Sequence, residues 1–473
     1  MPDVIGQLLD SDLGKQVVRL LGLPAPAELR RHEPDAPLAP APVLVAAAQG
    51  GRLRERVAEV LVAEGVQVHD LGEPAADDDL TPVLDEVLPG EVVPGEALRP
   101  GRAHAVVLDA TGLTSASDAG VLRAVLGPVV RRLGPSGRVV VLGAPVDASG
   151  DPRTAAVQQG LEAFTKSVAK ELRDGGTAQL VRVAEGGEGG LPGVLRFLLS
   201  GRSAYVSGQV LVLEPAPDGA AVAPADPARP HQGRVALVTG ASRGIGEAIA
   251  EVLARDGAHV VCLDLPAAGD RLAAVANRVG GTTLQQDITA PDAGARIVEH
   301  LTERFGGVDV VVHNAGITRD KTLAGMDAAR WDSVVAVNLA AQEAIDDALL
   351  AAGTLHRGGR IVGVASTSGI AGNRGQANYA LTKAGVIGRV RALAPVLAEH
   401  GATANAVAPG FIETEMTASM PVGVREVGRR LNALSQGGLP VDVAEAVSFL
   451  AAPDAGWTSG QTLRVCGLSL LGA

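Results

Sequence analysis

VALVTGASRGIGEAIAEVLARDG, residues 235–257, predicts a buried strand, a glycine-rich turn and an amphipathic helix in direct succession. The turn carries Gly240, Gly244 and Gly246 in the spacing G-x-x-x-G-x-G. Glycines let a backbone turn sharply and approach a pyrophosphate, which the amides of the following helix then bind. A glycine-rich turn without a ligand is the alternative. We favour a dinucleotide site, with Gly240, Ser242, Arg243, Gly244, Ile245 and Gly246 as its candidate residues.

Further apolar runs follow this unit and alternate with amphipathic stretches. HVVCLDL (259–265), VDVVVHNAG (308–316) and GRIVGVAS (359–366) are predicted strands. Regular alternation of strands and helices predicts an α/β fold with a doubly wound parallel sheet.

Asp264 lies at the end of HVVCLDL (259–265), the second predicted strand of this half of the chain. A carboxylate at this place can bind the 2′-hydroxyl of an adenosine ribose. The same carboxylate would repel a 2′-phosphate. Arg243 favours the opposite choice, because an arginine in this turn can pair with that phosphate. We give Asp264 the greater weight and expect NAD(H) to be favoured over NADP(H).

The first half of the chain repeats the second in the same order. VLVAAAQGGRLRERVAEVLVAEG (43–65) matches the opening unit, and GRVVVLGA (137–144) matches GRIVGVAS. HAVVLDATGL (104–113) and YVSGQVLVL (205–213) match later stretches of the second half. We infer duplication of one fold. The first half is shorter between about residues 72 and 103, where one strand–helix unit is expected to be missing.

A linker rich in Pro and Ala, residues 214–232, separates the two halves. We predict an extension over residues 1–40 with an amphipathic helix near 5–21, a first domain over 41–213 and a second over 233–473. At 473 residues, two or three domains are expected.

The totals exclude several classes of protein. A net charge of -12 argues against a nucleic-acid role. Two cysteines indicate no disulfide framework and fit a reducing compartment. The amino-terminal stretch lacks the features of a signal peptide, and we find no apolar run long enough to span a membrane. We expect a cytoplasmic protein, without a metal site.

NYALTK, residues 378–383, contains one of the two tyrosines in the chain and one of its five lysines. On a helix, Tyr379 and Lys383 lie one turn apart on the same face. A nearby ammonium stabilises a phenolate, so Lys383 is expected to lower the pKa of Tyr379 and make it useful for proton transfer. An incidental Tyr and Lys on a helix is the alternative.

With these motifs, residues 233–473 resemble a short-chain dehydrogenase/reductase, and within that family the bacterial 3-oxoacyl-[acyl-carrier-protein] reductases. The resemblance rests on TGASRGIG, HNAG (313–316), YALTK and PGFIET (409–414), together with Ser366 thirteen residues before Tyr379. The duplicated layout resembles the high-molecular-weight form of that reductase, with a cofactor-free first domain. His313 departs from the usual Asn, but we expect the cofactor wall behind it to survive.

The resemblance implies reduction of a 3-oxoacyl thioester in fatty acid biosynthesis, with Tyr379 as proton donor and Ser366 bound to the carbonyl oxygen. Lys383 would hold the nicotinamide ribose, and Asn338 would keep a water between Lys383 and solvent. The implied catalytic set is Asn338, Ser366, Tyr379 and Lys383, and Tyr379 and Lys383 also contact the cofactor. Further implied cofactor contacts are Asp287, Ile288, Asn314, Ala315, Gly316, Ile412 and Thr414.

The first half has lost these groups. Ala48, Arg52 and Arg54 replace the three glycines, and Ala144, Thr154 and Gln158 replace Ser366, Tyr379 and Lys383. We predict that this half binds no dinucleotide in this way and catalyses no such reduction. It would act as an internal pseudo-subunit, so that a homodimer of the chain imitates a short-chain reductase tetramer. A docking module for a partner protein is the alternative.

The segment from Phe411 to about Pro440 is expected to cover the substrate. It mixes apolar residues with Arg425, Arg429 and Arg430, which would suit an acyl chain on an anionic carrier, although a solvated basic helix face explains them equally well. Arg357 and His400 take the positions expected for carrier-protein docking. His400 is mostly neutral at pH 7, so a coenzyme A thioester remains open. A dehydrogenase of another secondary alcohol, or a non-catalytic dinucleotide-binding sensor or scaffold, are the other functions considered.

Overall fold

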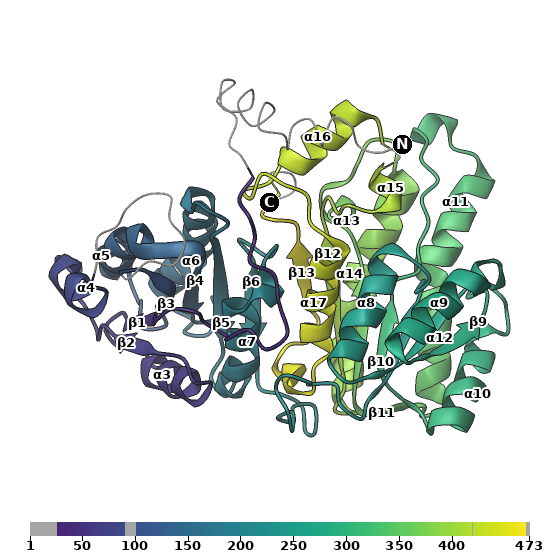
Figure 1. Ribbon diagram of the computed structural model, residues 1–473, viewed down its shortest axis with the longest axis horizontal. Helices are drawn as coiled ribbons and strands as arrows, with labels where there is room; N and C mark the ends of the chain where they lie inside the picture. The colour runs from purple at the N-terminus through teal and green to yellow at the C-terminus, as the bar shows by residue number, and fades with distance from the viewer. Residues whose placement is uncertain (1–25, 90–100, 419, 470–473) are drawn as a thin grey trace.

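The computed structural model describes residues 26–89, 101–418 and 420–469, which form two α/β domains with one parallel sheet each (Figure 1). The expectation of two tandem doubly wound domains is confirmed. No helix in these residues is both long and apolar enough to cross a membrane. The helix expected near residues 5–21 falls outside the described residues.

The first domain is built on a sheet with the strand order β2-β1-β3-β4-β5-β6. Its strands are β1 (Val43–Ala47), β2 (Val68–Asp70), β3 (Ala103–Asp109), β4 (Leu133–Gly143), β5 (Thr177–Val183) and β6 (Val210–Leu213). Its helices are α3 (Arg54–Ala63), α4 (Thr81–Val87), α5 (Gly120–Val129), α6 (Pro152–Glu171) and α7 (Leu191–Leu199). The central strands are buried on both faces, which explains their continuous apolar sequences.

The second domain is built on a sheet with the strand order β13-β12-β11-β10-β7-β8-β9. Its strands are β7 (Val235–Thr239), β8 (His259–Asp264), β9 (Thr282–Gln285), β10 (Val308–His313), β11 (Leu355–Val364), β12 (Thr403–Pro409) and β13 (Thr462–Val465). Its helices are α8 (Gly244–Arg255), α9 (Gly269–Val279), α10 (Ala293–Phe305), α11 (Ala328–Val335), α12 (Ala341–Ala351), α13 (Ser368–Ala371), α14 (Ala377–Ala398), α15 (Glu415–Ala418), α16 (Val422–Arg430) and α17 (Pro440–Ala451). Within the described residues, the first sheet lacks a counterpart of β9, where its sequence is shorter.

Two buried arginines occupy matching places in the two domains. Arg138 lies in β4 and Arg360 in β11, and each is about 1% exposed. Arg138 donates to the carbonyl of Ser200 after α7, and Arg360 donates to that of Ala452 after α17. Equivalent strands thus anchor the end of equivalent helices, which supports duplication of one fold.

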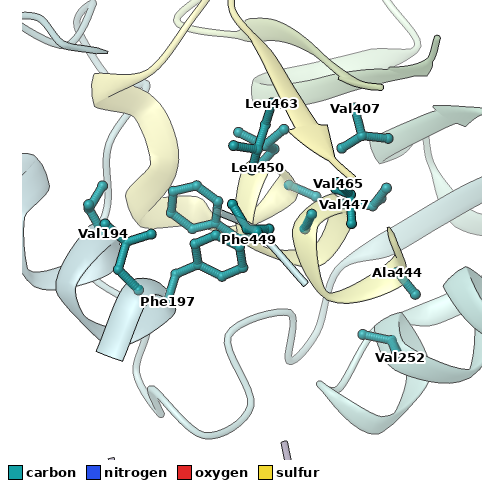
Figure 2. Close-up of a cluster of buried hydrophobic side chains, with 14 of the residues drawn as sticks. Val194, Phe197, Val252, Val407, Ala444, Val447, Phe449, Leu450, Leu463 and Val465 are labelled. Atoms are coloured by element: carbon teal, nitrogen blue, oxygen red, sulfur yellow. The ribbon is translucent and has the colours of Figure 1, made fainter. Parts of the chain in front are cut away.

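The two domains share one hydrophobic core, which runs through the contact between α7 and α17 (Figure 2). The rings of Phe197 and Phe449 stack across this contact with centroids 4.3 Å apart and planes 6° from parallel. Every residue of α17 from Asp442 to Ala451 is buried, because α17 lies between its own sheet, α8 and the first domain. Stacked aromatic pairs contribute about 0.5–1.5 kcal/mol beyond their buried area.

Ion pairs surround this apolar contact. Arg202 of the first domain bonds to Asp256 and Glu445 of the second, both at 2.7 Å. Arg255 also binds Glu445, at 2.6 Å. Arg31 makes a two-point contact with Asp442 at the start of α17. Buried carboxylates need such partners, since an unpaired buried charge is strongly destabilising. The contact therefore specifies one arrangement of the two domains.

The linker over residues 214–232 forms no helix or strand, as expected, but it is tied to the second domain. Arg360 and Arg357 donate to the carbonyls of Ala220 and Asp218. His231 is fully buried and contacts Ser448 of α17 through Nε2, 3.0 Å from the hydroxyl. The linker is therefore part of the packed structure rather than a loose tether.

We predict that stability falls with acid because two buried histidines must stay neutral. Burial lowers the pKa of His231 and of His104 to about 3, below the ordinary 6.5. The unfolded chain therefore binds these protons at a higher pH than the folded one. Their contribution is complete above pH 6.5 and is lost as the pH falls toward 3, at about 1.4 kcal/mol per pH unit for each histidine.

Thermal unfolding midpoints at pH 7.5, 6.0 and 5.0 measure this effect. The pH dependence should become shallower in His231→Asn, and should not change in His400→Asn, whose side chain is exposed. Equal midpoints across this range would contradict the prediction.

Candidate functional site

The glycine turn joins β7 to α8 at the carboxyl edge of the second sheet, as the sequence predicted. Gly240 and Gly244 have φ of +68° and +61°, a region that other residues rarely adopt. A Cβ at Gly246 would lie 2.0 Å from the carbonyl oxygen of Gly240. In the described part of the chain, no side chain caps the start of α8, so its amides point toward an open anion site.

Residues after β10 hold the turn in place. The Asn314 side chain donates to the carbonyls of Thr239 (3.0 Å) and Gly240 (3.1 Å). The Thr239 hydroxyl accepts the N–H groups of Asn314 and Ala315, both at 3.1 Å. These bonds place Asn314 and Ala315, the wall expected from HNAG, directly beside the glycine turn.

His313 turns away from this wall. Its Nε2 lies 2.7 Å from Asp346 of α12, which also binds Arg389 of α14 at 3.1 Å. The histidine is buried, and its aspartate and arginine partners compensate for that burial. The departure from the usual Asn therefore leaves the contacts of Asn314 and Ala315 intact.

Asp264 holds the turn with both of its carboxylate oxygens. One accepts the N–H of Ser242 at 3.1 Å and the other that of Leu265 at 2.8 Å. Arg243 and Arg271, both exposed, converge on Glu415 at 3.3 and 3.5 Å. Two guanidinium groups thus lie close to the turn that Asp264 supports.

Asp287 and Ile288 follow β9, next to the end of β8. Gln286 donates its N–H to the carbonyl of Asp264, which brings the two strand ends together. Asp287 accepts the N–H and the hydroxyl of Thr289 at 2.9 and 2.7 Å, and Ile288 is 8% exposed. An adenine at this position would meet a backbone fixed by these bonds.

Tyr379 and Lys383 lie on one face of α14, with Lys383 Nζ 5.7 Å from the ring centroid. Lys383 is 3% exposed and donates to the carbonyl of Val364 at 2.7 Å. Burial lowers the pKa of Lys383 to about 8. Burial raises the pKa of Tyr379, and a hydrogen bond with Ser366 acts in the opposite direction. The expected lowering of the Tyr379 pKa by Lys383 is therefore not found in the protein without cofactor, because desolvation of the phenol is the larger effect.

Asn338 lies in a π-helical turn, Ala336–Ala340, between α11 and α12. Its side chain accepts the N–H of Ile317 at 2.8 Å and donates to the Ile317 carbonyl at 3.0 Å. Gln342 donates to the main-chain carbonyl of Asn338 at 2.8 Å. A π-turn often marks a functional position in a helix. Ile317 and Gln342 could not be identified from the sequence, because amide contacts of this kind leave no spacing pattern.

Gly316 brings the wall and α14 together. A Cβ at this glycine would lie 3.4 Å from both Asn338 Oδ1 and Lys383 Nζ. Asn338 also donates to the hydroxyl of Thr382 on α14, at 3.3 Å. Asn338, Ser366, Tyr379 and Lys383 therefore lie close together beside the glycine turn, and their catalytic roles stay a prediction.

The segment from Phe411 to Pro440 leaves the carboxyl end of β12 at this same edge of the sheet. Ile412 is buried, and the main-chain N–H of Thr414 bonds to the hydroxyl of Thr417 at 2.8 Å. Arg429 binds Glu413 and Glu426. The segment's own acids therefore neutralise part of the basic character that we expected for an anionic carrier.

The corresponding turn of the first domain contains an internal carboxylate. Asp109, 1% exposed, accepts the N–H groups of Leu53 (2.6 Å) and Arg54 (3.1 Å) at the start of α3. The Arg52 side chain pairs with Glu188 and with the carbonyl of Val183. The Asp109 side chain thus occupies the helix terminus that corresponds to the start of α8.

Gln158 takes the position of Lys383 in the repeat and is fully buried. It donates to the carbonyls of Ala110 and Leu113, both at 3.0 Å, and accepts the N–H of Ala144 at 2.9 Å. A neutral amide therefore fills this position with internal hydrogen bonds.

Comparisons with known proteins agree with this site. The family model described as "Enoyl-(Acyl carrier protein) reductase" matches residues 240–467. The chain is 42% identical to the 3-oxoacyl-[acyl-carrier-protein] reductase FabG of Vibrio cholerae over 236 residues, which is 50% of this chain and 97% of the relative. Identity to the FabG proteins of Escherichia coli and Pseudomonas aeruginosa is 41% and 43% over 239 residues, with the same coverage.

A doubly wound domain with a glycine turn and a Ser-Tyr-Lys set at its carboxyl edge defines a dinucleotide-dependent oxidoreductase. Through its second half, the chain belongs to the short-chain dehydrogenase/reductase family, with FabG reductases among its relatives.

The prediction that NAD(H) is favoured over NADP(H) is wrong. The FabG reductases that match the second half depend on NADPH. The structure supplies the physical reason, because both oxygens of Asp264 already bind backbone N–H groups. Asp264 thus supports the turn, and Arg243 and Arg271 place two guanidinium groups close to it.

We predict that Arg243→Ala weakens NADPH binding by about tenfold to a hundredfold, the usual effect of losing a charge-assisted hydrogen bond. The dissociation constant is measured from the fluorescence of bound NADPH. Arg296→Ala, which removes an exposed arginine from α10, is the matched control. NADPH affinity unchanged in Arg243→Ala would contradict a role for this arginine.

Proposed function

We propose that the protein reduces a 3-oxoacyl thioester to the 3-hydroxyacyl thioester with NADPH. The convergence of Ser366, Tyr379, Lys383 and Asn338 beside the glycine turn supports this proposal. A dinucleotide-binding sensor would need the turn but would not need a proton donor.

The fit of the dinucleotide rests on the geometry of the turn. A side chain at Gly246 would overlap the Gly240 carbonyl, and the uncapped start of α8 offers amides to a pyrophosphate. We propose that the cofactor contacts the turn residues, Asp264 and the wall Asn314–Gly316. Asp287, Ile288, Ile412 and Thr414 would contact its other parts.

When bound, NADPH supplies a hydride to the ketone carbon. The Tyr379 hydroxyl then donates its proton to the carbonyl oxygen, and the Ser366 hydroxyl donates a hydrogen bond to that oxygen as negative charge develops. Burial keeps Tyr379 protonated at neutral pH, which suits a proton donor. Lys383 places a positive charge 5.7 Å from the ring, and Asn338 holds the wall against α14.

For the group that carries the acyl chain, we propose more than one possibility. The relatives are named for an acyl-carrier-protein substrate. In this chain Arg429 is paired with acids, and Arg357 binds the linker carbonyl of Asp218. We therefore propose that coenzyme A and carrier-protein thioesters are both substrates, since the reacting ketone is the same in each. Both cysteines are free and buried, which fits a cytoplasmic location.

We propose that the first domain is a non-catalytic pseudo-subunit. Asp109 and Gln158 occupy the positions of the pyrophosphate and the catalytic lysine. The shared core between α7 and α17 resembles an obligate interface between subunits more than a loose contact between domains. The alternative, a docking module for another protein, has no comparable support.

We further propose that the chain forms a homodimer through α12 and α14 of the second domain. A hollow of about 410 Å³ lies between these helices, lined by Leu339, Glu343, Gly385, Gly388, Arg389, Ala392 and Leu393. Small residues on α14 would let a second copy of this helix approach closely. Such a dimer would place four similar domains together.

We expect acetoacetyl-CoA to be reduced with NADPH, and Tyr379→Phe to lower kcat by at least about a hundredfold, because the proton donor is lost. kcat/KM should stay level through neutral pH and fall above about pH 8, where Lys383 loses its proton. The measurement is the initial rate of NADPH oxidation at 340 nm.

Arg296→Ala serves as the control for Tyr379→Phe. Turnover that survives in Tyr379→Phe would contradict both the role of Tyr379 and an inactive first domain. No turnover in the wild type, despite NADPH binding, would favour another ketone or the sensor.

We predict that Gly388→Arg dissociates the dimer. A Cβ at Gly388 meets no atom within 4 Å, so a larger side chain fits the single chain but blocks a second α14. Gly160→Arg on α6 of the first domain is the matched control, because that glycine is equally open. Light scattering after size exclusion should give a dimer for wild type and Gly160→Arg. A dimer in Gly388→Arg would place the interface elsewhere.

A further inference from the structure

Tyr205, the second tyrosine of the chain, reaches from the first domain into the segment that leaves the active-site edge. Its hydroxyl donates to the carbonyl of Gln436 at 2.7 Å and accepts the side-chain N–H of Asn432 at 3.2 Å. Its main-chain carbonyl accepts the N–H of Gly467 at 3.0 Å. The residue is 1% exposed, so all of these bonds are shielded from water.

The Tyr205 ring leaves room only for glycine at two positions of the second domain. A Cβ at Gly438 would lie 2.5 Å from the ring, and one at Gly467 would lie 2.9 Å from it. Close backbone contact of this kind fixes the position of the segment more tightly than side-chain packing alone.

The residues that Tyr205 holds form the base of the substrate segment. Gly438 pairs with the start of the segment, just after β12. Its carbonyl accepts the N–H of Glu413 at 2.8 Å, and its N–H donates to the carbonyl of Phe411 at 3.0 Å. Asn432 donates to the carbonyl of Arg429 at 2.9 Å, at the end of α16. Gln436 also bonds to the carbonyl of Ala27, so the first domain and the chain before it hold one side of this base.

The far part of the segment, α15 and α16, presents apolar side chains at the surface. Met416 of α15 and Val424 and Val427 of α16 are exposed apolar side chains, 55–59% accessible. The segment therefore has a buried base bonded to the first domain and an exposed apolar part beside the active-site edge.

A matching aromatic residue reaches in the opposite direction. Trp457 of the second domain lies against Gly189 and Gly190 of the first, where an added Cβ would come within 2.2 and 2.8 Å of its side chain. In the first domain the connection from β5 to α7 is only the short turn 184–190. In the second, the connection from β12 to α17 spans 410–439. The same kind of contact thus holds a simple turn on one side and the base of a long segment on the other.

We propose that Tyr205 is a positioning residue for the acyl substrate, an inference that rests on the proposed reductase function. By fixing residues 432–438, it sets where α16 lies beside the active-site edge, and so the surface offered to the acyl chain. The catalytically inactive domain thereby contributes to substrate binding without contacting the substrate.

The test compares Tyr205→Phe with Arg196→Gln in the full-length chain. Tyr205→Phe removes only the hydroxyl. Arg196→Gln breaks a different contact across the same domain boundary, the pair with Asp454, outside the segment. For Tyr205→Phe we expect KM for acetoacetyl-CoA to rise about three- to tenfold, as for one lost hydrogen bond, with kcat within twofold. Hydrogen exchange of residues 431–438 should accelerate, and Arg196→Gln should change neither quantity.

Unchanged KM and exchange in Tyr205→Phe would overturn the inference, and so would equal changes in Arg196→Gln. If the wild type does not reduce acetoacetyl-CoA, the proposed function fails for that substrate, and the positioning role fails with it. The exchange measurement then still shows whether the hydroxyl holds the base of the segment. Faster exchange without any change in KM would limit Tyr205 to a structural contact and would also overturn the inference.

Discussion

The contact between α7 and α17 is the constraint on which the rest of this structure depends. It joins two sheets into one hydrophobic core, with Phe197 and Phe449 stacked at its centre and Arg202 paired with Asp256 and Glu445 beside it. Because α17 is buried along its length, the second domain alone would expose an apolar helix surface to water. The first domain therefore shields from water a surface of α17 that the second domain alone would expose.

The two domains show how one fold keeps or loses a site at the same edge of its sheet. In the second, glycines and an uncapped helix leave a place for an anion. In the first, Asp109 binds the equivalent amides and Gln158 fills the lysine position. Asp109 and Gln158 are both hydrogen-bonded within the first domain, so burying them there carries no large penalty in stability. Under the proposed function, the first domain then serves packing and positioning.

Much of the fold and of the site could be predicted from local patterns. Apolar runs marked the strands, and the spacing of Gly240, Gly244 and Gly246 identified the turn. The buried arginines Arg138 and Arg360 lie in the repeated GRVVV and GRIVG stretches that indicated duplication. Each of these signals survives in a linear sequence because it depends on residues that are close along the chain.

Other properties depend on neighbours far along the chain. Asp264 indicated NAD(H) in the sequence, but its oxygens are bound to Ser242 and Leu265, and the NADPH-dependent relatives overturn that prediction. Lys383 was expected to control the pKa of Tyr379, but burial by the surrounding fold is the larger effect. The arginines of α16 looked available, yet Arg429 is paired with Glu413 and Glu426.

By itself, then, the sequence determined the two parallel-sheet domains, the glycine turn and the residues of the candidate catalytic set. Those features follow from periodicity and from short spacings. Only the tertiary structure decided what each charge and each aromatic contacts, including Tyr205 against residues 432–438. Burial, charge pairing and hydrogen bonding act between residues that lie hundreds of positions apart, and no local pattern records which of them meet.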